Sequence, residues 1–174
     1  MRLHFVDNNP AVIEGLRKAF VDCNEVTIKE GSIFDYASCT VVSPANSYGF
    51  MDGGIDKEYI RFFGLTPQDS LRKIIAQTDE GYLPIGSAII VKTGNNDIPN
   101  MICAPTMIGP EVVRKENAFF AMAAILNISE NKQYITDIYC PGLCTGVGGV
   151  SGQDAAEEMA NAYRKWKIKN NGMN

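Results

Sequence analysis

Two stretches of the chain combine glycines with side chains that could bind or transform a ligand. The first runs from Val41 to Asp56 and reads VVSPANSYGFMDGGID: a short β-branched segment, a loop with three glycines, and the expected start of a helix. The second runs from Cys140 to Gly152, reads CPGLCTGVGGVSG, and also lies between an expected strand and an expected helix. This is the order of a strand that ends at a ligand, and two such loops on neighbouring strands would form one cleft.

The second of these loops has the composition of an anion-binding site. Glycines allow successive backbone N–H groups to turn toward one point, and a helix N-terminus close behind adds a positive dipole. Because both loops are poor in lysine, an acidic protein could hold a nucleotide diphosphate there through neutral donors. The same glycines are also consistent with a tight strand-to-helix turn. The sequence is neither a P-loop nor a clean GxGxxG motif.

The first loop adds two polar side chains. Asn46 offers a donor and an acceptor together, which is the pairing that a sugar diol needs. Asp56 follows Gly53 and Gly54 at the expected start of a helix, where a carboxylate is also stabilised by the helix dipole. Taken alone, each residue fits a functional role and a capping role equally well.

Composition limits the classes of protein. A chain of 174 residues that is 45% hydrophobic and 21% charged is typical of a globular domain, and no apolar run approaches the roughly 18 residues of a membrane span. The polar N-terminus lacks the apolar segment of a signal peptide, so we expect a cytoplasmic location. A net charge of -4 argues against nucleic acid as a partner.

The cysteines and the single histidine are expected to be structural. The five cysteines form no CxxC pair, and neither a disulfide framework nor a metal site is predicted from Cys23, Cys39, Cys103, Cys140 and Cys144. His4 lies inside the first expected strand, well before any loop. A histidine can act as a general base, but a structural hydrogen bond is the better interpretation here.

The apolar pattern predicts alternating strands and helices. Strands are expected at residues 3–6, 26–28, 40–43, 86–91, 101–105 and 135–140, and helices at residues 12–20, 55–63, 66–75, 114–128 and 153–167. Continuous apolar runs favour strands that are covered on both faces, and the close spacing of 86–91 and 101–105 favours an antiparallel hairpin. We therefore predict one α/β domain over residues 1–174, a three-layer α/β/α sandwich with a mixed, mostly parallel sheet. Both glycine-rich loops would lie at the carboxyl ends of its strands.

The combination of segments SPANSYGFMDGGID, PIGSAIIVKTGN, PTM and YCPGLCTGVGGVSGQDAA resembles the macro domain family, and this resemblance covers nearly the whole chain. Members of that family bind ADP-ribose, and some branches hydrolyse its derivatives. The family's first loop is usually written NAANxxLxGGGGVD and its second GxxTGxYGxP. The resemblance implies ADP-ribose or a derivative, including ADP-ribosylated protein, as the partner, with no cofactor.

The resemblance also assigns roles to residues. It implies that Asn46 contacts the distal ribose and that Asp56 stands where hydrolytic members keep a catalytic acid, so these two residues are the catalytic candidates. The implied ligand-binding residues are Ser32, Ile33, Ala45, Asn46, Gly53, Gly54, Ile55, Gly142, Leu143, Cys144, Thr145, Gly146, Val147, Gly148 and Gly149. Within this set, the residues from Cys144 to Gly149 are expected to wrap the diphosphate.

Some positions depart from the family's pattern. Ser32 replaces the Asp that accepts from the exocyclic amine of adenine, so adenine selectivity depends on whether Asp35 reaches the base. The aromatic residue near the distal ribose is replaced by Gly148, which is expected to open that end of the cleft unless Tyr48 or Phe50 takes its place.

The start of the first loop departs as well. Ser43 and Pro44 replace the usual Asn-Ala, and the proline is expected to stiffen the loop. These changes indicate a divergent branch of the family with a shifted substrate.

Three functions are consistent with this sequence. The first is hydrolysis at the distal ribose of an ADP-ribose conjugate, namely ADP-ribosylated protein, O-acetyl-ADP-ribose or ADP-ribose 1''-phosphate. The second is a non-catalytic ADP-ribose-binding module. The third is a structural or partner-binding domain whose cleft has lost its ligand. The fold alone does not separate these functions, because function depends on the site.

Overall fold

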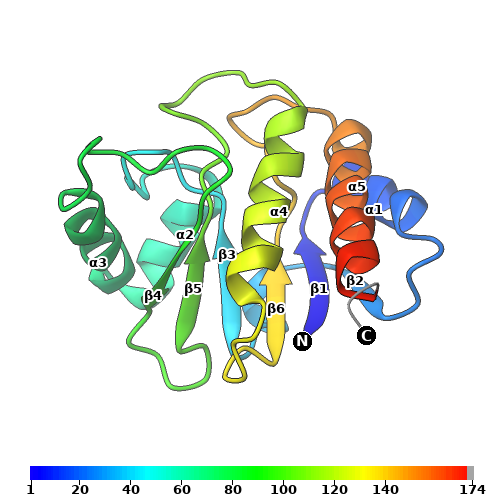
Figure 1. Cartoon of the computed structure of the whole chain (residues 1–174), viewed down its shortest axis with the longest axis horizontal. Coiled ribbons are helices and arrows are strands. Elements are labelled where there is room, and N and C mark those ends of the chain that lie inside the picture. The colour runs from blue at the N-terminus through cyan, green and yellow to red at the C-terminus, as the bar shows by residue number, and fades with distance from the viewer. Residues whose placement is uncertain (172–174) are drawn as a thin grey trace.

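A six-stranded sheet in the order β2-β1-β6-β3-β5-β4 forms the centre of the computed structural model, which describes residues 1–171 (Figure 1). The last three residues of the domain expected over 1–174 lie outside this range. The strands are β1 (Arg2–Asp7), β2 (Val26–Glu30), β3 (Thr40–Ser43), β4 (Ile89–Lys92), β5 (Asn100–Cys103) and β6 (Asp137–Cys140). The helices are α1 (Pro10–Ala19), the 3-10 turn η1 (Ile33–Asp35), α2 (Gly54–Phe63), α3 (Thr66–Ile75), α4 (Glu116–Ser129) and α5 (Gly152–Asn171).

The sheet is parallel except at one edge. Strands β1, β2, β3, β5 and β6 pair in parallel, and β4 pairs with β5 in antiparallel register. The predicted mixed sheet and its hairpin are therefore confirmed. Strands β3 and β6, which lead into the two glycine-rich loops, are direct neighbours. Both loops consequently emerge side by side at the carboxyl edge of the sheet.

Helices cover both faces of the sheet, as predicted. Successive strand residues point to opposite faces, so Val42 and Ile102 belong to one apolar cluster while Val41 and Met101 belong to the other. The first cluster includes residues of α1, α4 and α5, and the second includes residues of α2 and α3. In Figure 1, α4 and α5 lie in front of the sheet and α2 lies behind it.

The start of α1 follows the sequence signal. The Asn9 side chain caps the helix by accepting from the Ala11 N–H at 3.0 Å, and Pro10 occupies the first helical position. This helix packs closely on α5 because Gly15 and Gly152 face each other. A Cβ on Gly15 would lie 2.5 Å from the Gly152 carbonyl oxygen. The close approach fixes the start of α5, directly behind the second loop.

Two strands begin later than predicted because turns occupy their expected first residues. Before β4, the Ser87 N–H donates to the Pro84 carbonyl and Gly86 has φ +90°, so the strand starts only at Ile89. Before β6, the Ile135 N–H donates to the Lys132 carbonyl, and the strand starts at Asp137.

His4 makes structural hydrogen bonds within the sheet, as predicted. His4 Nε2 lies 2.7 Å from Asp137 Oδ1, His4 Nδ1 lies 2.6 Å from Thr27 Oγ1, and the ring stacks on Tyr139. All five cysteines are free thiols, and four of them are buried.

Within residues 1–171, no helix is both long and apolar enough to cross a membrane.

Candidate functional site

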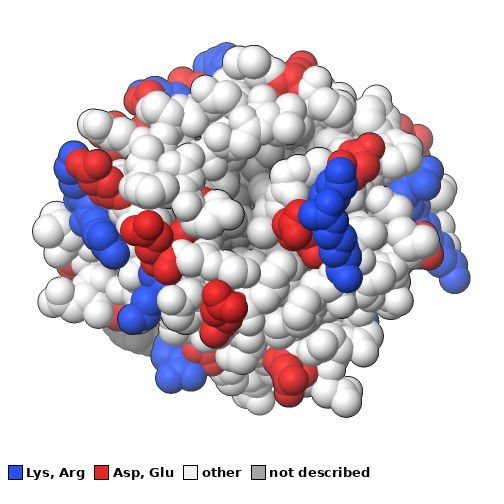
Figure 2. Space-filling model, turned by 180° about the vertical axis from the view of Figure 1, so that it is seen from behind, with Lys and Arg blue, Asp and Glu red and all other residues white. Residues whose placement is uncertain are grey.

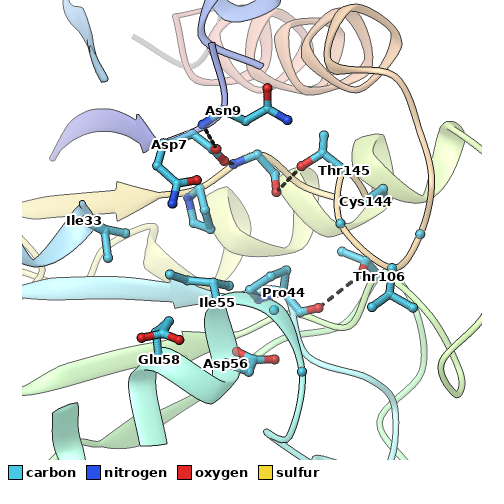
Figure 3. A pocket seen from close by; sticks show the side chains of 18 of the residues that line it. Asp7, Asn9, Ile33, Pro44, Ile55, Asp56, Glu58, Thr106, Cys144 and Thr145 are labelled. Carbon is cyan, nitrogen blue, oxygen red and sulfur yellow. Dashed lines mark hydrogen bonds between the residues drawn. The ribbon is translucent and has the colours of Figure 1, made fainter. Parts of the chain in front are cut away.

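A cleft of about 750 Å³ opens at the carboxyl edge of the sheet. Its walls come from five segments: the β1–α1 turn, the start of η1, the loop after β3, the segment after β5 and the loop after β6. Figure 2 shows the hollow, whose edge is formed mainly by uncharged residues. In Figure 3, Asp7 and Asn9 lie on one side of the cleft, and Ile55 and Asp56 lie on the other. The two glycine-rich loops thus form one cleft, as their positions in the sequence predicted.

The side chain of Asn46 lines the cleft but also organises its own loop. Its Oδ1 accepts from the N–H groups of Tyr48 and Phe50, at 3.1 and 3.2 Å, and its Nδ2 donates to the Phe50 carbonyl at 2.8 Å. The loop is further held by α3, because Gln68 accepts from the Met51 N–H at 2.8 Å. Asn46 therefore retains one amide hydrogen for a ligand, while the rest of its amide holds the loop.

Helix α2 begins at the cleft wall without a side-chain cap. Its N-cap is Gly53, and Gly54 and Ile55 line the cleft beside it. The N–H groups of residues 54–56 have no acceptor within the described part of the chain. The positive end of this helix and its unused donors are therefore available to an anionic ligand.

Asp56 sits in the first turn of α2, and its side chain is almost completely buried. It is 7% exposed, and its Oδ1 accepts a hydrogen bond of 2.6 Å from the Ser43 hydroxyl. Burial raises the pKa of Asp56 to about 7, the nearby charge of Asp52 adds to the increase, and the Ser43 hydrogen bond opposes it. Near neutral pH this carboxyl group exists in both protonation states, which suits an acid or base in proton transfer.

The second loop presents a run of free backbone donors. The N–H groups of residues 143–148 donate to no acceptor in the described range. The ends of the loop are fixed: Asp7 Oδ2 accepts from the Gly142 N–H at 2.9 Å, and the Val150 N–H donates to the Cys144 carbonyl at 3.0 Å. Cys144 adopts a positive φ of 65°, which turns the chain sharply. This pattern is typical of a backbone nest for an anion.

Residues 106–113 form a wall of the cleft that joins the two loops. The Thr106 hydroxyl donates to the Pro44 carbonyl at 3.1 Å, and the Ser47 N–H donates to the Met107 carbonyl at 2.9 Å. At the other end of the segment, the Val113 N–H donates to the Gly148 carbonyl at 3.0 Å. No site residue was predicted in this segment, although it also follows a strand whose carboxyl end reaches the cleft.

Gly148 does not open its end of the cleft, contrary to expectation. A Cβ at this position would lie 2.7 Å from the Cys144 carbonyl oxygen and 3.0 Å from Val113 Cγ2. The space beside Gly148 is therefore filled by the Cys144 backbone of the same loop and by the Val113 side chain of the 106–113 segment. Of the two aromatic residues considered as replacements, Phe50 lines the cleft, whereas Tyr48 is absent from its walls and lies 6.5 Å from the ring of Tyr82.

At the end of the cleft near η1, the polar side chain of Ser32 already has a hydrogen-bond partner within the protein. Ser32 lines it, and its hydroxyl oxygen accepts from the Phe34 N–H as the cap of η1. Asp35 does not line the cleft. Asp7, Asn8 and Asn9 do line it, although the sequence pattern of this stretch predicts only the start of a helix.

Most of the predicted ligand-binding residues lie on the cleft wall. Those that line it are Ser32, Ile33, Asn46, Gly53, Gly54, Ile55, Gly142, Cys144, Thr145, Gly146, Val147 and Gly148, together with Asp56. Ala45, Leu143 and Gly149 do not. Ala45 and Leu143 belong to the apolar clusters beneath the two loops, so their side chains support the loops from below.

Over residues 42–159 the sequence matches the family described as Macro domain. The chain belongs to the macro domain family. A relative from Aquifex aeolicus, described as an uncharacterized protein, is 31% identical over 146 residues, which is 83% of this chain and 84% of that protein.

Solved macrodomains share the fold of this macro domain. The macrodomain of Mycobacterium tuberculosis DarG superposes with a TM-score of 0.67 at 20% identity, over 79% of this chain and 88% of that one. The Trypanosoma brucei macrodomain in complex with ADP-ribose superposes with a TM-score of 0.62 at 19% identity, over 80% and 56% of the two chains. The α/β sandwich is thus confirmed by comparison as well as by its own topology.

Proposed function

We propose that the cleft binds ADP-ribose and that backbone N–H groups, rather than basic side chains, hold its diphosphate. The observation that carries this proposal is the run of unused donors at residues 144–148 on the cleft wall. No lysine or arginine is among the described residues that line the cleft, so the neutral donors must supply the anion site. Membership of the macro domain family and the fold shared with a macrodomain in complex with ADP-ribose support the same ligand.

The opposite wall complements this arrangement. The uncapped start of α2 faces the same cleft as the second loop, and a helix N-terminus favours negative charge. The volume of about 750 Å³ lies within the range of small-molecule pockets. A dinucleotide-sized ligand would therefore contact both loops at once, with its diphosphate between two sets of free N–H groups.

Calorimetric titration with ADP-ribose, AMP and ribose 5-phosphate tests this proposal. We expect ADP-ribose to bind more tightly than either fragment, because only the whole ligand reaches every segment of the cleft wall. Equal affinities for AMP and ADP-ribose would remove the distal ribose from recognition. Absence of ADP-ribose binding would overturn the proposed function.

A second function, hydrolysis at the distal ribose of an ADP-ribose conjugate, is favoured by Asp56. Its pKa of about 7 allows the carboxylate to accept a proton from an attacking water near neutral pH. The water oxygen would form the new bond to the ribose carbon, the bond to the leaving group would break, and the leaving group would keep that electron pair and take a proton from solvent. The remaining amide hydrogen of Asn46 would orient the ribose during this step.

The Asp56→Asn variant separates an enzyme from a binding module. Asparagine can still accept the Ser43 hydrogen bond, so the fold and the cleft should be retained, but it cannot take the proton. If the protein is a hydrolase, turnover of an ADP-ribose conjugate should be lost while affinity for ADP-ribose stays within a few fold. If neither the natural chain nor the variant consumes any conjugate, the protein is a non-catalytic ADP-ribose-binding module.

A further inference from the structure

One carboxylate on the cleft wall has no hydrogen-bond or ion-pair partner among the described residues. Asp52 lines the cleft in the first loop, and its side chain makes no hydrogen bond or ion pair within residues 1–171. Its side chain is exposed. The pattern typical of the family's first loop has a glycine at this position, which means that the carboxylate is a feature of this chain.

The other acidic residues of the cleft are already engaged. Asp7 accepts backbone hydrogen bonds from Asn9 and Gly142, and Glu58 is paired with Arg61. Asp56 is buried and bonded to Ser43. Among the acidic residues that line the cleft, Asp52 is therefore the one whose side chain has no hydrogen-bond or ion-pair partner within residues 1–171.

Among the described residues that line the cleft, none is a lysine or arginine that could offset this charge. Arg72 lies near this loop, but its guanidinium carbon packs 4.3 Å from the centre of the Phe50 ring and does not line the cleft. Asp52 and Asp56 line the same wall of the cleft, and the charge of Asp52 adds to the effect of burial in raising the pKa of Asp56. A ligand group placed beside Asp56 would feel the same field.

We propose that Asp52 restricts the cleft to ADP-ribose conjugates whose group on the distal ribose is neutral or cationic, and excludes the anionic 1''-phosphate. The physical reason is repulsion between an unpaired carboxylate and a phosphate monoester dianion in a site without basic residues. An ester or a nitrogen-linked side chain carries no such penalty. This inference rests on the proposed function, since it takes the distal ribose to lie beside Asp56.

The test compares the affinities for ADP-ribose and ADP-ribose 1''-phosphate by calorimetry at low salt, which requires no turnover. In the natural chain, ADP-ribose should bind at least about tenfold more tightly, as expected for repulsion between close charges. Asp52→Asn should improve the affinity for the 1''-phosphate by about fivefold or more and change that for ADP-ribose by less than about twofold. High salt should reduce the preference of the natural chain.

Asp97→Asn is the matched control. Asp97 lies in the turn before β5, at the opposite edge of the sheet from the cleft, and is exposed. Its replacement also removes one negative charge and should leave both affinities unchanged. Equal binding of the two ligands by the natural chain, or an unchanged ratio in Asp52→Asn, would overturn the inference while leaving ADP-ribose binding intact. If ADP-ribose itself does not bind, the proposed function fails, and the inference fails with it.

Discussion

The Ser43 hydroxyl donates a hydrogen bond of 2.6 Å to Oδ1 of Asp56, and both side chains are buried. This bond connects the last residue of β3 to the first turn of α2, across the whole first loop. Ser43 stands where the family's pattern has asparagine. Ser43, which departs from the family's pattern, is therefore the hydrogen-bond partner of the catalytic candidate Asp56.

Burial of Asp56 should make the protein less stable as pH rises. Because the folded-state pKa of about 7 lies above the ordinary value of 3.8, the folded state binds more protons than the unfolded state between these values, and stability falls through this range. Asp56→Asn does not lose stability in this way. Between about pH 4 and pH 8, the free energy of unfolding of the natural chain should therefore fall by about 4 kcal/mol more than that of the variant. Urea unfolding at the two pH values measures the difference.

The exposed Asp52 provides the control for this experiment. Asp52→Asn removes the same charge from the same loop, but its side chain is solvated, so the pH dependence of unfolding should change little. An equal effect of pH on the natural chain and on Asp56→Asn would show that Asp56 is not held in a buried, partly protonated state.

Removal of the Ser43 hydroxyl should raise the pKa of Asp56 further. The hydrogen bond stabilises the carboxylate, so in Ser43→Ala the ionised form is opposed by desolvation and by the charge of Asp52, with no hydrogen bond to offset them. Titration of the Asp56 carboxyl carbon by NMR should then show a midpoint above about 7, and any turnover that needs the carboxylate should rise at higher pH. Ser43→Thr keeps the hydroxyl and should restore the original midpoint. A midpoint that is the same in all three proteins would contradict the assignment.

Asn46 should affect the first loop even when no ligand is present. Asn46→Ala removes the acceptor for the Tyr48 and Phe50 N–H groups, so hydrogen exchange at those two amides should become faster in the free protein. Asn46→Asp keeps the acceptor but loses the donor to the Phe50 carbonyl, and should protect the same amides better than Asn46→Ala. Unchanged exchange in Asn46→Ala would limit this residue to direct ligand contact.

A charge in the second loop should oppose ligand binding. A Cβ on Gly146 meets no atom within 4 Å, so a longer side chain fits there without disturbing the fold. Gly146→Glu should weaken ADP-ribose binding at least about tenfold more than Gly146→Gln, because the two side chains differ in charge and hardly in size. Calorimetry on both variants measures this ratio. Equal losses would mean that the diphosphate lies away from this loop.

The fold was largely predictable because its signals are local. Apolar runs gave all six strands, three-and-four spacing gave the helices, and Asn9 with Pro10 marked the start of α1 correctly. The errors occurred where a turn competes with a strand, as at Gly86, whose positive φ delays β4. Periodicity does not reveal such a turn, because the residues that follow it remain apolar.

The site was predictable only in part because its decisive contacts join distant residues. Glycine composition indicated both loops, but the bonds from Thr106 to Pro44 and from Asp7 to Gly142 depend on strand order. The state of Asp56 likewise depends on burial by the packed chain, which composition does not specify. Side-chain roles could be assigned by type, whereas their protonation and their partners required the three-dimensional arrangement.

The two loops of the cleft rest on opposite faces of the sheet. Ala45 and Met51 anchor the first loop in the apolar cluster with α2 and α3, and Leu143 and Cys144 anchor the second in the cluster with α1, α4 and α5. Substitutions in one cluster can therefore reshape one wall of the cleft while the other wall keeps its geometry. Under the proposed function, the chain can accommodate new groups on the ribose by repacking one layer, without rebuilding the loop proposed to hold the diphosphate.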